Sequence, residues 1–181
     1  IDLSEILGRI ARLADGDAGV RQKLEEMTAY VDTSGVPDEP LLKMAKLGYV
    51  MDTWMQEVDV TISAVQCWTS MEEYFGVVPC TIMSMLSNAN LPSACEVDVM
   101  GTISMHALAL ASETPAALLD WNNNYGDDPD KAVCFHCSNL PKDFFESATM
   151  DYQAIIAGTL GPDNTYGTMV GNVLPGPMSF A

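Results

Sequence analysis

Two acidic residues lie two positions apart in the apolar stretch Ser93–Gly101, where Glu96 and Asp98 follow Ala94 and Cys95. This stretch predicts a buried strand, on which side chains two positions apart point to the same side. Burying an unpaired charge is costly, and it can shift the pKa until the group is neutral. The pair therefore predicts a site that supplies a cation, a basic partner or the water of a cleft.

The distribution of charge favours the cation. The chain has 181 residues, with 8 Lys and Arg against 25 Asp and Glu, and no Lys or Arg occurs between positions 47 and 130. Because Glu96 has no basic residue near it in sequence, a divalent cation is the favoured counter-charge. The net charge of −17 argues against binding to nucleic acid or to an anionic membrane surface.

The size and composition predict one domain with one core, since 48% of the residues are apolar. No apolar run approaches the roughly 18 residues of a membrane span. Five cysteines form an odd number in apolar surroundings, which favours reduced thiols in a cytoplasmic protein. The chain starts without Met and stops within an apparent strand, so we expect a piece of a longer polypeptide.

The pattern of apolar residues predicts an α/β fold in three parts. Residues 1–57 form a helical segment, with helices over about 4–14, 17–33 and from 37 onward. Residues 58–145 form the core that carries the site, a mostly parallel sheet with flanking helices. Its expected strands are 60–66, 94–99, 116–120 and 132–136, and its expected helices are 71–75, 80–87 and 102–112. Residues 146–181 begin an antiparallel β region.

Polar residues follow each of the four predicted strands. The carboxyl ends of parallel strands meet at one edge of a sheet, so we expect these side chains to gather there. Amides donate and accept hydrogen bonds with hydroxyl groups, and an indole face packs against the C–H side of a sugar. Each side chain alone also has a structural explanation, such as an Asn that closes a turn. The predicted site residues are Gln66, Trp68, Glu96, Asp120, Asn122, Asn123 and His136.

The spacing of Cys134 and Cys137 also occurs in redox and zinc sites. A redox pair favours a helix N-terminus, whereas this pair closes a strand. A zinc site needs further Cys or His ligands, and the remaining ones are irregularly spaced. We therefore interpret these cysteines as buried thiols beside a functional His136.

Five multi-residue motifs together resemble the L-fucose/L-arabinose isomerase family, specifically its fucose-isomerase-like members. The resemblance extends over roughly residues 20–181. It implies a metal-dependent aldose–ketose isomerase that acts on a pentose or 6-deoxyhexose through an ene-diol. It also implies Mn²⁺ or Mg²⁺ as the cofactor, a small-molecule sugar as the partner, and a homo-oligomer. The motifs are residues 66–70, 76–80, 93–101, 119–129 and 135–141.

The resemblance assigns roles by position. Glu96 resembles a metal-binding acid, and Asp120 takes the place of a metal-binding histidine of arabinose isomerases, so both are predicted catalytic residues and metal ligands. Asp98 is expected to support the site structurally rather than to bind the metal. Gln66 stands where fucose isomerases have another metal-binding acid, and it is expected to contact sugar together with Trp68, Asn122, Asn123 and His136.

A second interpretation is a non-catalytic sugar-binding or interaction domain that keeps the isomerase fold. Gln66 in place of a metal-binding acid favours this interpretation. A second reason is that the family's last metal-binding histidine is expected beyond Ala181 and so is not part of this sequence.

Overall fold

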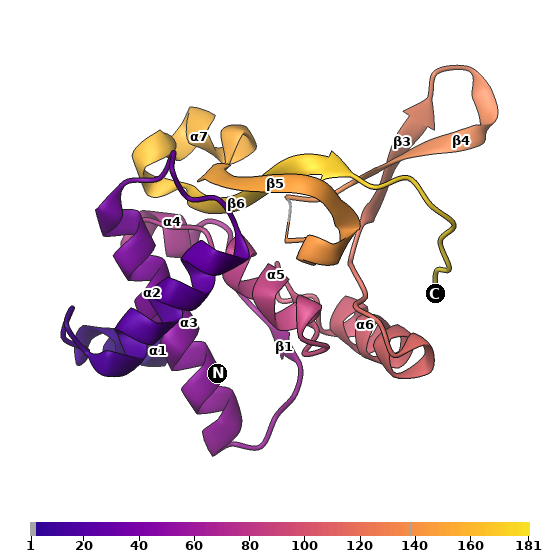
Figure 1. Cartoon of the computed structure of the whole chain (residues 1–181). Helices are drawn as coiled ribbons and strands as arrows, with labels where there is room; N and C mark the ends of the chain where they lie inside the picture. The colour runs from indigo at the N-terminus through magenta and orange to yellow at the C-terminus, as the bar shows by residue number, and fades with distance from the viewer. Residues whose placement is uncertain (1–2, 138) are drawn as a thin grey trace.

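Three helices form the N-terminal part of the computed structural model, which describes residues 3–137 and 139–181 (Figure 1). They are α1 (Leu3–Ala11), α2 (Ala18–Tyr30) and α3 (Asp38–Glu57). Asp17 begins α2 as predicted, because its carboxylate accepts a hydrogen bond from the Gly19 N–H at 2.9 Å. None of the helices in the described ranges is long and apolar enough to cross a membrane.

The core forms where α3 meets the following helices, α4 (Ser70–Tyr74) and α5 (Cys80–Asn88). Helix α3 has an apolar stripe at helical spacing, on which Leu41, Met44, Met51 and Trp54 are buried. Gly48 lies on the same stripe and permits close packing, since a Cβ there would stand 2.9 Å from Cδ1 of Ile82 in α5. The helical N-terminal segment therefore packs its apolar side against the rest of the chain.

The antiparallel region predicted at the C-terminal end is confirmed. Strands β5 (Phe145–Tyr152) and β6 (Tyr166–Val173) pair antiparallel, with α7 (Ala154–Leu160) between them in sequence. Two short 3₁₀ helices, Lys142–Phe144 and Pro162–Asn164, flank these elements. The Val78 N–H donates to the Tyr166 carbonyl at 2.9 Å, and this bond ties β6 to the loop before α5.

The predicted parallel sheet is much smaller than expected. Strands β1 (Ser63–Ala64) and β2 (Ser93–Ala94) are its two members, and each has only two residues. The predictions of strands over 60–66 and 94–99 were therefore too long. A parallel strand extends only where neighbours supply hydrogen bonds on its sides. Of the other two predicted strands, 116–120 is a strand only at Asp120, and 132–136 is a strand from 132 to 135.

Residues 120–135 form an antiparallel hairpin, so the assignment of 116–120 and 132–136 to a parallel sheet was wrong. The hairpin consists of β3 (Asp120–Tyr125) and β4 (Asp128–Phe135) and projects from the body of the molecule (Figure 1). Its loop has two residues, and Gly126 in the first loop position has a φ of 57°. Glycine adopts this left-handed conformation without strain, which suits a tight hairpin turn.

Glu96 and Asp98 lie in a turn rather than on one strand, so they do not share a strand face as predicted. Glu96 and Val97 have φ values of 58° and 57°, and the Val97 N–H donates to the Val65 carbonyl at 3.2 Å. Asp98 then begins helix α6 (Val99–Ser112), with its carboxylate accepting from the Gly101 N–H at 2.7 Å. Asp98 thus has the supporting role that was expected.

Replacing Asp98 with alanine is expected to lower the free energy of unfolding by about 1 kcal/mol, the usual effect of removing a helix N-cap. The loss follows because the N–H of Gly101 would lose its acceptor. Urea unfolding followed by circular dichroism measures it. Asp127→Ala removes the same charge at an exposed loop position and should change stability by much less. Equal effects of the two changes would contradict the capping role.

Candidate functional site

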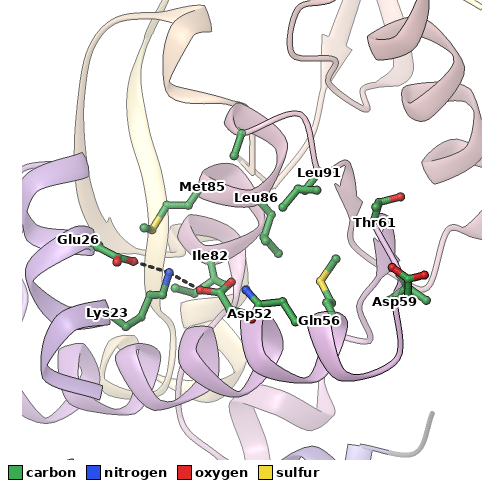
Figure 2. A pocket seen from close by; sticks show the side chains of 13 residues that line it. Lys23, Glu26, Asp52, Gln56, Asp59, Thr61, Ile82, Met85, Leu86 and Leu91 are labelled. Carbon is green, nitrogen blue, oxygen red and sulfur yellow. Dashed lines mark ion pairs between the residues drawn. The ribbon is translucent and has the colours of Figure 1, made fainter. Parts of the chain in front are cut away.

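The structure has two cavities to consider, and the larger contains none of the predicted site residues. It measures about 570 Å³ and lies beside α2, α3 and α5 (Figure 2). Its lysine, Lys23, is already paired, with Nζ 2.7 Å from Glu26 and 2.5 Å from Asp52. This pairing neutralises Lys23, Glu26 and Asp52 within the protein.

The smaller cavity, of about 260 Å³, brings together most of the predicted residues. Trp68, Glu96, Asp120, Asn122 and His136 all line it. Gln66 and Asn123 are exposed and are not among its lining residues. The structure thus places five of the seven predicted residues around one hollow, although they are spread over positions 68 to 136.

The carboxylate of Glu96 reaches this cavity because of the turn between β2 and α6. A left-handed backbone is uncommon for residues other than glycine and is a genuine outlier for a β-branched residue such as Val97. Such strain costs on the order of 1–3 kcal/mol per residue and concentrates at functional sites. The surrounding hydrogen bonds from Val97 to Val65 and from Gly101 to Asp98 hold the turn in place.

The hairpin supplies another wall. Asp120 and Asn122 lie two positions apart at the start of β3, and Asp120 pairs with Phe135 of β4, which also lines the cavity. The chain continues into His136 and Cys137. The Cys137 carbonyl is anchored by Gln153 Nε2 at 2.8 Å and Thr168 Oγ1 at 3.0 Å. These bonds fix the base of the hairpin against the C-terminal sheet.

Glu72 of α4 is a lining residue that was not among the predicted site residues. Its side chain is 1% exposed, and neither carboxylate oxygen has a hydrogen-bond partner. Burial raises the pKa of Glu72 to about 7. The sequence places Glu72 and Glu73 side by side on a short helix, and only tertiary packing buries one of them. A buried acid that titrates near neutrality is typical of functional sites.

Three cysteines also line this cavity, and they are Cys67, Cys80 and Cys137. The sulfur of buried Cys95 lies 3.5 Å from Cys137 Sγ and 3.4 Å from His136 Nε2. Hydrogen bonds from Cys80, Cys95 and His136 hold the pKa of Cys137 below its usual value. Burial lowers the pKa of His136, but its interactions with Cys137, Asp120 and Glu96 outweigh this effect and raise it.

The donor atoms of the cavity fall into two chemical kinds. Carboxylate oxygens come from Glu72, Glu96 and Asp120, and such hard donors suit Mn²⁺ or Mg²⁺. The two orphaned oxygens of Glu72 show that the cavity contains unsatisfied acceptors. Within the described residues, however, only one group of three or more His, Cys, Asp or Glu has its ligand atoms within 4.8 Å of one another, and it is Cys95, His136 and Cys137.

The structure is therefore a mixed α/β protein with an acidic cavity that also offers an amide, an indole and an imidazole. No family model matches the chain. The chain is similar to sulfoquinovose isomerases at 25% identity, over 115 residues for the protein of Alkalicoccus urumqiensis and over 138 for that of Priestia aryabhattai. These matches cover 64% and 76% of this chain but only 26% and 30% of those proteins. The chain thus spans less than a third of the curated relatives it matches.

Proposed function

We propose that this chain forms part of the active site of a metal-dependent aldose–ketose isomerase of the L-fucose/L-arabinose type. The proposal rests on one observation: two acids, Glu96 and Asp120, line the same cavity as side chains that can contact a sugar. Those side chains are Trp68, Asn122 and His136. The similarity to sulfoquinovose isomerases supports the same class of reaction.

The reaction moves protons between two neighbouring carbons of a sugar. A base removes the proton from C2, and the electron pair forms the C1–C2 double bond while O1 takes up a proton. The resulting ene-diol then loses the O2 proton and gains a proton at C1, which gives the ketose. Glu96 is the proposed base at this step. Glu72 is a second candidate for proton exchange, because its pKa of about 7 lets it hold or release a proton near neutral pH.

The other lining residues would position the sugar. The Trp68 side chain is 60% exposed and offers an indole face to its C–H side. Asn122 and His136 have polar atoms for its hydroxyl groups. Glu96 and Asp120 would hold Mn²⁺ or Mg²⁺, which supplies positive charge beside the two sugar oxygens that exchange roles.

The charge of the cavity bears on the substrate. Its lining contains no Lys or Arg, while Glu72, Glu96 and Asp120 contribute acid groups. An anionic sugar would meet no basic side chain on these walls. We therefore favour a neutral pentose or 6-deoxyhexose over sulfoquinovose, which carries a sulfonate.

Isomerisation in heavy water tests this function. The longer polypeptide that is expected to contain this chain, reduced and supplied with Mn²⁺, is incubated with L-fucose, L-arabinose or sulfoquinovose, and the ketose and its deuterium content are measured by NMR. We expect conversion of a neutral sugar with deuterium uptake, and loss of that conversion after treatment with EDTA. Conversion that survives complete removal of metal would contradict the metal dependence.

The alternative is a sugar-binding domain without catalysis. It is favoured by the arrangement of the acids, because among the described residues no group of three or more ligands that includes these carboxylates has its ligand atoms within 4.8 Å of one another. Calorimetry with the same sugars separates the two functions. Sugar binding without ketose formation or deuterium uptake, with Mn²⁺ present, would establish the alternative and refute the isomerase.

A further inference from the structure

Four cysteines from separate segments converge beside His136. Cys95 follows β2, Cys137 follows β4, Cys67 precedes α4 and Cys80 begins α5. The Cys67 thiol contacts that of Cys95, and the Cys80 thiol contacts that of Cys137. Neither the proposed reaction nor the proposed sugar contacts use these sulfur atoms.

We propose that Cys95, His136 and Cys137 form a binding site for a thiophilic divalent cation of the Zn²⁺ type, separate from the carboxylates of the cavity. The three ligand atoms lie within 4.8 Å of one another. Cys95 Sγ is 3.5 Å from Cys137 Sγ, and His136 Nδ1 is 3.6 Å from Cys95 Sγ and 3.4 Å from Cys137 Sγ. Tetrahedral Zn²⁺ with bonds of about 2.3 Å to sulfur and 2.0 Å to nitrogen requires separations of roughly 3.8 Å and 3.5 Å. The three side chains thus lie near the required geometry.

The orientation of His136 supports this site. The Cys137 N–H donates to His136 Nδ1 at 2.9 Å, so in the neutral ring Nδ1 carries the lone pair and Nε2 carries the proton. Nδ1 is the nitrogen that can bind a cation, and it lies 3.6 Å from Cys95 Sγ and 3.4 Å from Cys137 Sγ. Gln153 Nε2 and Thr168 Oγ1 also bond the Cys137 carbonyl, which limits movement of the Cys137 backbone. Such outer contacts orient metal ligands in established sites.

The chemistry of the donors separates this site from the proposed Mn²⁺ site. Thiolates and imidazole select Zn²⁺ and similar soft ions, whereas carboxylates suit Mn²⁺ and Mg²⁺. The interpretation of Cys134 as a buried thiol was wrong, because Cys134 is exposed on β4, and the buried Cys95 is the cysteine that lies beside Cys137. The inference does not depend on the proposed sugar or reaction.

Titration of the reduced protein with Co²⁺ as a spectroscopic substitute for Zn²⁺ tests this site. We expect one equivalent to bind with thiolate-to-cobalt charge-transfer absorption, and Zn²⁺ to displace it. Cys95→Ser and Cys137→Ser should each weaken binding at least about tenfold, since even outer-sphere changes reach that size. Cys134→Ser is the matched control and should bind as the wild type does. Absence of charge-transfer absorption, or equal losses in all three variants, would overturn the proposal.

A measurement on the wild-type protein avoids dependence on how the variants fold. The reduced protein is treated with a maleimide with and without Zn²⁺, and modified cysteines are mapped by mass spectrometry. Zn²⁺ should slow modification of Cys137 at least about tenfold and EDTA should reverse this, while Cys134 reacts equally in both conditions. Equal protection by Mn²⁺, or none by Zn²⁺, would refute a thiophilic site.

Discussion

Glu96→Gln is expected to reduce kcat/KM for sugar isomerisation by about 10³-fold, within the range for loss of a general acid or base. The amide cannot accept the C2 proton, and it binds a divalent cation more weakly than a carboxylate does. The affinity for Mn²⁺, measured by calorimetry, should fall in parallel. This combination would distinguish a residue that serves both catalysis and cation binding from one that serves catalysis alone.

The matched control for this change is Glu146→Gln, which removes one negative charge from an exposed position of β5. It should leave kcat/KM and the Mn²⁺ affinity within about twofold of the wild type, because exposed charges interact weakly across solvent. Activity of Glu96→Gln within a few fold of the wild type, in a folded protein, would show that Glu96 has neither role.

Glu72→Gln is expected to stabilise the protein above neutral pH while it lowers isomerase activity. In the folded protein the pKa of Glu72 is about 7, raised by burial from its ordinary 4.5. The folded state therefore binds more protons than the unfolded chain between these values, and the free energy of unfolding falls as the pH rises through them. A glutamine stays neutral at every pH. The free energy of unfolding of the variant should therefore exceed that of the wild type by at most about 3 kcal/mol near pH 8, and the difference should vanish below about pH 4.5.

Urea unfolding across this pH range measures the stability, and the NMR assay measures activity. Glu73→Gln is the matched control, because Glu73 is the exposed neighbour of Glu72 on the same helix. It should leave both the pH dependence and the activity close to the wild type. If Glu72→Gln keeps full activity but gains stability, the burial of Glu72 is real and its part in proton exchange is excluded.

The helices were predictable because each carries its own signal. The apolar stripe from Leu41 to Trp54 has helical spacing, and Asp17 is a cap that the local sequence reveals. The lengths and partners of the strands were harder to predict, because they depend on which segments hydrogen-bond alongside, and the local sequence does not specify this. The hairpin was not predicted, because β3 contains three asparagines, which are depleted in strands, and the two-residue loop at Gly126 and Asp127 therefore did not appear to join two strands.

The candidate site was predicted in part because its residues belong to recognisable motifs. Glu96, Asp120 and His136 do line one cavity. Glu72 was not distinguished from Glu73, since burial of one face of a five-residue helix arises from tertiary packing. The same limit applied to Cys95, whose distance from Cys137 depends on how the hairpin joins the body of the molecule.

The hairpin gives the two proposed cation ligands unequal mechanical support. Glu96 lies in a turn held by the hydrogen bond from the Val97 N–H to the Val65 carbonyl and by Asp98, which caps α6. Asp120, in contrast, begins a strand on which all six residues are exposed. A two-stranded hairpin is only marginally stable by itself. The apparent affinity of a site is its intrinsic affinity multiplied by the fraction of molecules in the competent arrangement. Any contact that restrains Asp120–Phe135 would therefore tighten cation binding without touching the cation.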